Sequence, residues 1–492
     1  MKNKLFFLSL VLVLFLSWQY LPRKTLGLAE IPKATDILDE KNYVWAAKSF
    51  WQTGIPTAWS NLDAYKVGIE GRKGIGFEDL SITFQGEKPS LKNREKFDYP
   101  VAAVEEIDVG KGKEQILFVQ PFFDHSFLAG LVYGLKTPNN ISSFVEVRSE
   151  DYRLMAVYVS LLSGLLLFLL TFLLYGHPMT ALLAFLIYST VGVYLLVSRY
   201  ALIENILVPL TLLSLVFLAL SKQPWVKKDY QKKIFWVLGG IGAGLALTTK
   251  EMGVAVLIAG VLIMLSRKIP WKNLLYFFLP AVIVGSLFYL YAFWLEPKLF
   301  SEIFFNQVNR GFFGPLNFLY AFYRPHFAGF PLEGWWIFGF LALLFLAKEF
   351  EKNREIILAF LSFLFVFVFF GGLNYPWYSL IFIPFLVIAS AVFLKELIFK
   401  PTIAKIIVFF LLPFSSTLYW GHNVFHKMGV NVLVYRLFIF VFLGLAILSL
   451  FKKKASFLGT IMSLIILMVL WKTYQWNVRG FEYWIANWGK LP

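Results

Sequence analysis

Long apolar runs, separated by short polar segments, recur along this chain of 492 residues. A helix needs roughly 17–25 mainly apolar residues to cross a hydrocarbon core of about 30 Å. Thirteen runs approach this length: about 4–21, 153–174, 178–198, 204–221, 234–250, 251–266, 272–294, 334–347, 356–372, 375–394, 403–420, 434–451 and 457–473. The pattern predicts an all-α polytopic membrane protein with about thirteen transmembrane helices.

The first apolar run follows Lys2 and Lys4, as the apolar part of a secretory signal peptide would. A cleavage site of small residues should then follow, but the chain has Trp18-Gln19-Tyr20 at that place. We therefore expect the first run to be a retained membrane anchor.

The segment 22–152 is more polar and contains shorter patterns. Residues at helical spacing in 38–53 are Asp39, Tyr43, Ala46, Ala47 and Phe50, whereas Lys41, Lys48 and Gln52 lie on other faces and Gly54 and Pro56 follow. This predicts an amphipathic helix in the membrane interface. The β-like runs 80–84 and 115–119 predict a small strand-bearing insertion at about 63–120. The aromatic stretch 121–135 predicts a second juxtamembrane helix.

Composition supports a membrane protein. Hydrophobic residues make up 58% of the chain and charged residues 15%, whereas a soluble domain is normally about 45–50% apolar. The net charge of +16 does not indicate nucleic acid as a partner, because the basic residues gather in short loops between apolar runs. The absence of cysteine from the sequence excludes disulfides and thiolate metal sites.

Lysine and arginine predict the orientation, since they are enriched in cytoplasmic loops. With a cytoplasmic N-terminus, the inside loops carry Lys2, Lys4, Lys222, Lys227, Lys228, Lys232, Lys233, Arg267, Lys268, Lys272, Lys348, Lys352, Arg354, Lys395, Lys400, Lys452, Lys453 and Lys454. The loop 22–152 and the tail 474–492 then lie outside the cytoplasmic membrane. We expect one integral membrane domain over 1–492, with its helical bundle at 153–473.

Several short motifs carry a resemblance to a known family. The outer loop opens with Asp39-Glu40-x-x-Tyr43-x-x-Ala46-Ala47 and ends near Asp124-His125, after which the helical bundle begins. Further motifs are Ser198-Arg199 with Glu204-Asn205, Thr248-Thr249-Lys250-Glu251 after a glycine-rich run, and Tyr375-Pro-Trp-Tyr378 through Pro384. In this order of motifs the chain resembles the GT-C glycosyltransferases, closest to the protein mannosyltransferase and aminoarabinose transferase branch (glycosyltransferase family 39-like). The resemblance extends from residue 1 to about 260.

The chain departs from the family pattern in three places. Ser126-Phe127 follows Asp124-His125 where the family usually has two prolines, and no arginine precedes the tyrosine of the late segment. The spacing from Asp39 to His125 is also longer than the family's. These departures leave the acceptor open: a lipid, a glycan or a protein.

The resemblance implies an inverting sugar transfer from a polyprenyl-phosphate donor. Such transfer needs a carboxylate to take the proton of the attacking hydroxyl; Asp39 is the expected base, with Glu40 as a lesser helper. Cations must stabilise the leaving phosphate; the candidates are Arg199, Lys250 and Arg324, with Arg310 and His326 as weaker ones. Asp124, His125, Glu204 and Tyr43 are expected to contact sugar or acceptor, and the three carboxylates Glu40, Asp124 and Glu204 alternatively pair with the cations or hold a divalent metal ion.

Other interpretations use the same residues. Asp39 and Glu40 also suit the N-terminus of a helix, and Arg199 and Lys250 suit helix ends as snorkelling anchors. A different class of function is a lipid or sugar transporter or flippase, in which charges mark a translocation path. The gathering of the notable charges on one side favours an enzyme. A nucleotide-sugar donor is disfavoured, because the sequence has no Rossmann-like glycine-rich turn.

Overall fold

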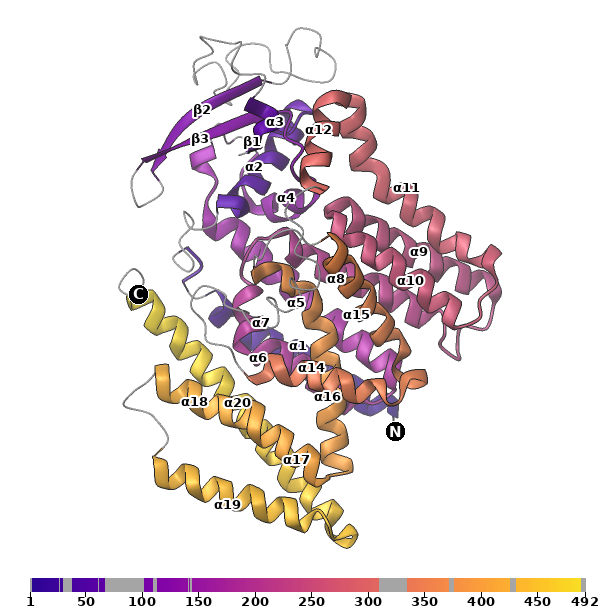
Figure 1. Ribbon diagram of the computed structural model, residues 1–492, viewed down its shortest axis with the longest axis vertical. Helices are drawn as coiled ribbons and strands as arrows, with labels where there is room; N and C mark the ends of the chain where they lie inside the picture. The colour runs from indigo at the N-terminus through magenta and orange to yellow at the C-terminus, as the bar shows by residue number, and fades with distance from the viewer. Residues whose placement is uncertain are drawn as a thin grey trace.

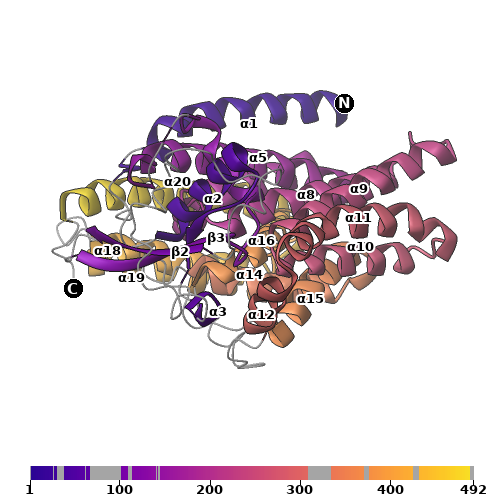
Figure 2. The same ribbon diagram turned by 90° about the horizontal axis from the view of Figure 1, so that it is seen from above.

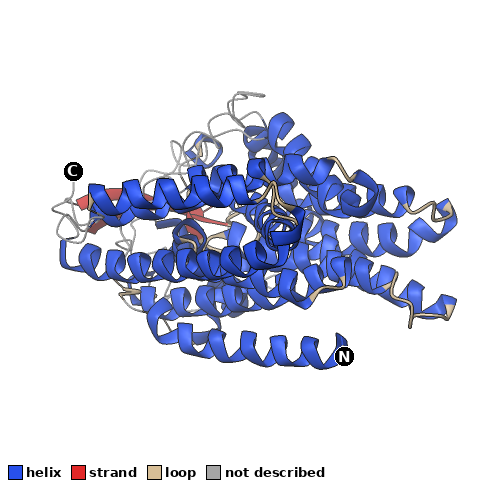
Figure 3. Ribbon diagram, turned by 90° about the horizontal axis from the view of Figure 1, so that it is seen from below, coloured by secondary structure: helices blue, strands red, loops and turns tan. Residues whose placement is uncertain are grey.

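The computed structural model describes residues 2–25, 27–29, 38–60, 62–66, 101–108, 113–139, 141, 144–308, 334–370, 376–424 and 431–487. Helices make up most of this part of the chain, and the few strands lie together at one end (Figure 3). The all-α fold predicted from the sequence is confirmed.

Every predicted apolar run overlaps a helix. These helices are α1 (Lys2–Lys24), α5 (Ser149–Tyr175), α6 (Pro178–Thr190), α7 (Gly192–Val197), α8 (Ile203–Leu220), α9 (Asp229–Thr249), α10 (Val254–Ser266), α11 (Trp271–Leu295), α14 (Gly334–Ala347), α15 (Phe350–Phe370), α16 (Ile383–Phe399), α17 (Ile403–Phe409), α18 (Ser415–Val424), α19 (Val432–Leu448) and α20 (Ala455–Asn487). Among the described residues, five helices are long and apolar enough to cross a membrane unaided: α5, α8, α11, the helix from Leu380 to Phe399, and α20 as far as Arg479. The number of crossings stays a prediction.

Small residues let the central helices approach closely. Figure 2 shows α9, α10 and α11 side by side. A Cβ atom on Gly240 of α9 would lie 2.2 Å from the backbone oxygen of Phe277 in α11, and one on Gly244 would lie 2.7 Å from that of Ala281. Ser214 of α8 donates a hydrogen bond of 2.8 Å to the Gly239 carbonyl. The glycine-rich run of α9 therefore lets both α8 and α11 pack closely against α9, as small residues do in other membrane bundles.

The segment between α1 and α5 forms a separate layer at one end of the bundle (Figure 1). It contains α2 (Leu38–Thr53), α3 (Asp63–Lys66), α4 (Leu128–Tyr133) and the strands β1 (Ala58–Trp59), β2 (Val101–Asp108) and β3 (Lys113–Gln120). The sheet order is β1-β3-β2, and both pairings are antiparallel. The predicted run 115–119 lies within β3, whereas 80–84 lies outside the described residues.

Helix α2 has the predicted bounds but a different environment. Residues 42–49 are all buried, so α2 is packed inside the protein and has no exposed polar face there. Lys48, expected on such a face, instead donates 2.7 Å hydrogen bonds to the carbonyl of Thr137 and to Oδ1 of Asn139. Burial lowers the pKa of Lys48. The periodicity predicted the helix, but it could not predict that Thr137 and Asn139 would pack over it.

Two further boundaries differ from the sequence prediction. The second juxtamembrane helix occupies only residues 128–133 of the predicted 121–135, followed by a short 3₁₀ turn, Gly134–Lys136. The last helix, α20, continues to Asn487, through most of the tail predicted from residue 474.

Candidate active site

Asp39 lies in the first turn of α2 and is half-buried. Tyr43 follows one turn later on the same face, because residues i and i+4 of a helix are neighbours. The Tyr43 ring meets the His125 ring edge-on, with 5.7 Å between the centroids. The backbone of α4 comes close to the same point, since a Cβ on Gly130 would lie 1.8 Å from the Tyr43 carbonyl oxygen. Helix α2 thus holds Asp39 and Tyr43 against the His125 segment.

Lys250 and Glu204 form a second group. Lys250 is the first residue after α9, and Glu204 lies in the first turn of α8. The Lys250 Nζ is 2.5 Å from Oε1 of Glu204, and both side chains are largely buried. The same Nζ lies 4.1 Å from the centroid of the Tyr378 ring, in the 3₁₀ helix η7 (Pro376–Phe382). Of the roles expected for Glu204, pairing with a cation is the one seen.

Tyr43 connects the two groups. Its side chain is buried, and burial raises its pKa well above the ordinary value. The negative charges of Asp39 and Glu204 and the neighbouring Tyr378 raise this pKa further, so all three lie within electrostatic reach of the Tyr43 hydroxyl. Tyr43 therefore contacts His125 and lies within electrostatic reach of both Asp39 and Glu204, the partner of Lys250.

Glu40 has an enclosed position. Its side chain is fully buried, with Oε2 lying 2.5 Å from Nη2 and 3.0 Å from Nε of Arg153 in α5. Oε1 accepts a 2.6 Å hydrogen bond from the backbone of Ala201. Arg153 also donates to the Leu28 carbonyl, at 2.8 Å. This network joins the turn after α1, helix α2, helix α5 and the turn before α8. Glu40 therefore connects these four segments, and its expected lesser part in the reaction stays a prediction.

Arg199 belongs with this buried network. It is fully buried in the turn between α7 and α8 and lies within electrostatic reach of Arg153 and Glu40. The sequence analysis named both Lys250 and Arg199 as candidate contacts for the donor phosphate. Their neighbours differ: Lys250 lies beside Glu204 and Tyr378. Arg199 lies near the Glu40–Arg153 pair.

Asp124 is the centre of a third polar cluster. Its Oδ2 accepts a 2.6 Å hydrogen bond from Ser60, next to β1. Tyr65 of α3 accepts a 2.8 Å hydrogen bond from the backbone of Phe123, and burial, then the charge of Asp124, raises the pKa of Tyr65. Gln307 of α12 (Pro297–Val308) donates to the Asp124 carbonyl at 3.4 Å. Asp124 thus fixes the turn that carries its neighbour His125.

Several candidates lie outside the described residues: Arg310, Arg324, His326 and Tyr375. In the part of the chain that the structure describes, no three His, Asp or Glu side chains gather closely enough to hold a metal ion. The sequence prediction missed Arg153 and the contact of Tyr378 with Lys250. The available signal for Arg153 was an arginine near the start of an apolar helix, because a charge there needs a partner.

Comparison with known proteins supports the motif-based resemblance. The model of the family described as dolichyl-phosphate-mannose-protein mannosyltransferase matches residues 117–297. No curated protein matches the chain. The crystal structure of ArnT from Cupriavidus metallidurans bound to undecaprenyl phosphate is similar, with a TM-score of 0.52 and 15% identity over 74% of this chain and 67% of that one. The chain therefore shares the fold of this ArnT structure.

Other solved structures match the chain with lower TM-scores. The apo form of the same ArnT has a TM-score of 0.48 at 14% identity, and the match covers 74% of this chain and 66%, just under two thirds, of the ArnT chain. An archaeal oligosaccharyltransferase, AglB from Archaeoglobus fulgidus, in complex with an inhibitory peptide and a dolichol-phosphate, has a TM-score of 0.37 at 12% identity, covering 74% of this chain and 48% of AglB. The GT-C region matched by the family model includes Asp124, Arg199, Glu204 and Lys250.

Proposed function

We propose that this GT-C protein transfers a sugar from a polyprenyl-phosphate carrier to a hydroxyl of a lipid, glycan or protein acceptor. The observation that carries the proposal is the position of Tyr43, which contacts His125 and lies within electrostatic reach of both Asp39 and Glu204, the partner of Lys250. These residues border apolar helices, where a lipid-linked sugar would present its phosphate and sugar. The family match over 117–297 supports the same class of reaction.

Lys250 is the proposed contact for the donor phosphate. A lysine at the end of a membrane helix offers a positive charge at the depth of a lipid phosphate. Glu204 and the Tyr378 ring hold its ammonium group in place before the donor arrives. As the bond between sugar and phosphate breaks, negative charge grows on the leaving phosphate and the attraction to Lys250 strengthens. Arg199 and Arg324 remain further proposed cations for this phosphate.

Asp39 is the proposed general base. The acceptor hydroxyl oxygen attacks the anomeric carbon, its proton passes to the Asp39 carboxylate, and the electrons of the broken bond leave with the polyprenyl phosphate. This displacement inverts the anomeric centre. A half-buried carboxylate beside Tyr43 and His125 is accessible to an acceptor yet held in position. Tyr43, His125 and Asp124 are the proposed contacts for the sugar or the acceptor, and Glu40 fixes the helix that carries Asp39.

The charge pattern supports an orientation with a cytoplasmic N-terminus and the active site on the outer face of the cytoplasmic membrane. An enzyme placed there receives its sugar on a lipid carrier, because nucleotide sugars are confined to the cytoplasm.

A direct test is to incubate the purified full chain with polyprenyl-phosphate sugars and candidate acceptors, and to measure release of polyprenyl phosphate. We expect release that depends on acceptor and falls strongly in Lys250→Gln. Lys298→Gln is the control, because it removes an equal charge from the start of α12. Movement of intact donor across a vesicle membrane, with no polyprenyl phosphate released, would instead favour a flippase.

A further inference from the structure

The end of α9 away from Lys250 carries a dense basic surface. Segments 222–233 and 267–272 together contain eight basic residues and one acidic residue, Asp229. Helix α9 separates this end from Lys250 by its 21 residues, about 30 Å at the rise of an α-helix. The basic surface is therefore independent of the proposed active site.

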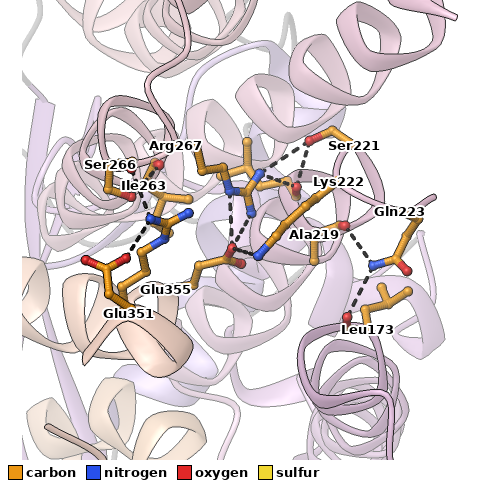
Figure 4. Close-up of polar contacts among 12 residues, drawn as sticks. Leu173, Ala219, Ser221, Lys222, Gln223, Ile263, Ser266, Arg267, Glu351 and Glu355 are labelled. Atoms are coloured by element: carbon orange, nitrogen blue, oxygen red, sulfur yellow. Dashed lines mark hydrogen bonds and ion pairs between the residues drawn. The ribbon is translucent and has the colours of Figure 1, made fainter. Parts of the chain in front are cut away.

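Part of this charge is already neutralised within the protein. Arg267 and Lys222 both contact Oε1 of Glu355, at 2.8 Å and 3.4 Å (Figure 4). Lys233 pairs with Asp229 at 2.8 Å. The remaining lysines are Lys227, Lys228, Lys232, Lys268 and Lys272, and none of them has a carboxylate within ion-pair distance among the described residues. We call these five lysines, which form no ion pair among the described residues, the basic face.

The two segments of the basic face are fixed to each other. Arg267 donates a 2.7 Å hydrogen bond to the Leu218 carbonyl, at the end of α8, in addition to its ion pair with Glu355 in α15. Arg354 of α15 donates to the carbonyl of Ser266, just before this turn, at 3.1 Å (Figure 4). Farther along, Lys233 of α9 lies 5.1 Å from the Tyr276 ring of α11. The lysines are thus presented by two connected turns.

Exposed aromatic residues surround the basic face. Trp225 is 61% and Trp271 is 68% exposed, and Tyr230 is also exposed. Lys228 lies over the Tyr230 ring and Lys272 over the Trp271 ring. Tryptophan and tyrosine concentrate at the level of lipid headgroups. From there the exposed apolar side of α11 begins, including Leu279 and Ile283. The basic face therefore lies at the water boundary of the bilayer.

One backbone feature singles out Lys268. Its φ of 57° lies in the left-handed region, where glycine is the favoured residue. Lysine occupies this position against the conformational preference of the backbone, and its side chain is exposed.

We infer that the basic face binds the headgroups of anionic phospholipids. The five lysines supply positive charge. The exposed aromatic residues place these lysines at the depth of the lipid headgroups. The contacts of Arg267 with Glu355 and Leu218 fix the two turns that carry the lysines. Lysines near an anionic membrane surface each strengthen binding about fivefold, and such clusters bind anionic lipid selectively.

The test measures phosphatidylglycerol binding to the purified full chain in zwitterionic mixed micelles, from the rise in melting temperature with added lipid. We expect saturable stabilisation by phosphatidylglycerol and none by phosphatidylcholine. The variant Lys227→Gln/Lys228→Gln/Lys268→Gln should bind about a hundredfold more weakly. Its control, Lys348→Gln/Lys453→Gln/Lys454→Gln, loses equal charge from other loops and should bind as the original chain does.

Three results would overturn the inference: equal loss in the control triple variant, full binding in the first variant, or equal stabilisation by inorganic phosphate, which would indicate a site for free anions. A single variant separates binding from folding. Lys268→Gly relieves the left-handed backbone, so the lipid-free melting temperature should hold or rise while affinity for phosphatidylglycerol falls about fivefold.

Discussion

At the scale of single residues, two neighbouring carboxylates have opposite environments. A helix turns about 100° per residue, so Asp39 lies beside Tyr43 while Glu40 points into the Arg153 network. The sequence identified both as candidates for one site but could not separate them, because Arg153 is 113 residues away. The spacing of residues within one helix cannot predict an ion pair between residues so far apart in the sequence. The Lys250–Glu204 pair was within reach of sequence analysis, since both lie at helix ends on the same predicted side.

Removal of the Glu40 charge should destabilise the protein strongly. In Glu40→Gln the guanidinium of Arg153 stays buried without its counter-charge, which typically costs about 3–5 kcal/mol. Glu150→Gln is a matched control, because its pair with Arg148 is exposed and screened by water. Thermal unfolding in detergent measures the difference. Equal melting temperatures for the two variants would mean that the Glu40–Arg153 pair does not hold α2.

Exchange of Glu204 should lower stability, because Lys250 would stay buried without its counter-charge, and should also change binding of the donor. Glu204→Gln removes the charge that neutralises Lys250 and leaves a side chain of the same size. We expect tighter binding of polyprenyl phosphate, because Lys250 no longer has to leave a carboxylate to meet the phosphate. Titration with polyprenyl phosphate measures this, and weaker binding would show that Glu204 is needed to orient Lys250.

At the scale of elements, periodicity predicted the helices and their approximate ends, including α2 from 38 to 53. It did not predict that α2 would be buried, because the residues that cover it come from 134–141 and from α4. Close packing of α4 on α2 depends on the lack of a side chain at Gly130. This contact sets the position of the helix that carries Asp39.

Gly130→Ala should therefore disturb the active site. Its Cβ would collide with the Tyr43 backbone, so α2 must shift and both melting temperature and transfer rate should fall. Gly444→Ala in α19 is the control: nothing lies within 4 Å of its added Cβ, and alanine favours a helix by about 1 kcal/mol over glycine. Unchanged activity in Gly130→Ala would contradict the role of this contact.

At the scale of the whole molecule, the proposed active site and the basic face lie at opposite ends of α9. A chain without cysteine allows this arrangement to be checked by single-cysteine labelling. Lys136→Cys, exposed beyond α4, should react with an impermeant maleimide added to intact cells, and Lys227→Cys only after permeabilisation. The reverse pattern would invert the proposed orientation.

The most direct measurement compares the kinetics of Asp39→Asn with those of the unaltered enzyme in the polyprenyl phosphate release assay. A general base typically contributes about 10²–10⁴-fold to the rate, so kcat should fall by that factor. The KM for the donor should change little, because Lys250 and Glu204 remain. Asp229→Asn, at the far end of α9, should leave kcat unchanged. Full kcat in Asp39→Asn would remove Asp39 as the base and contradict the proposed mechanism.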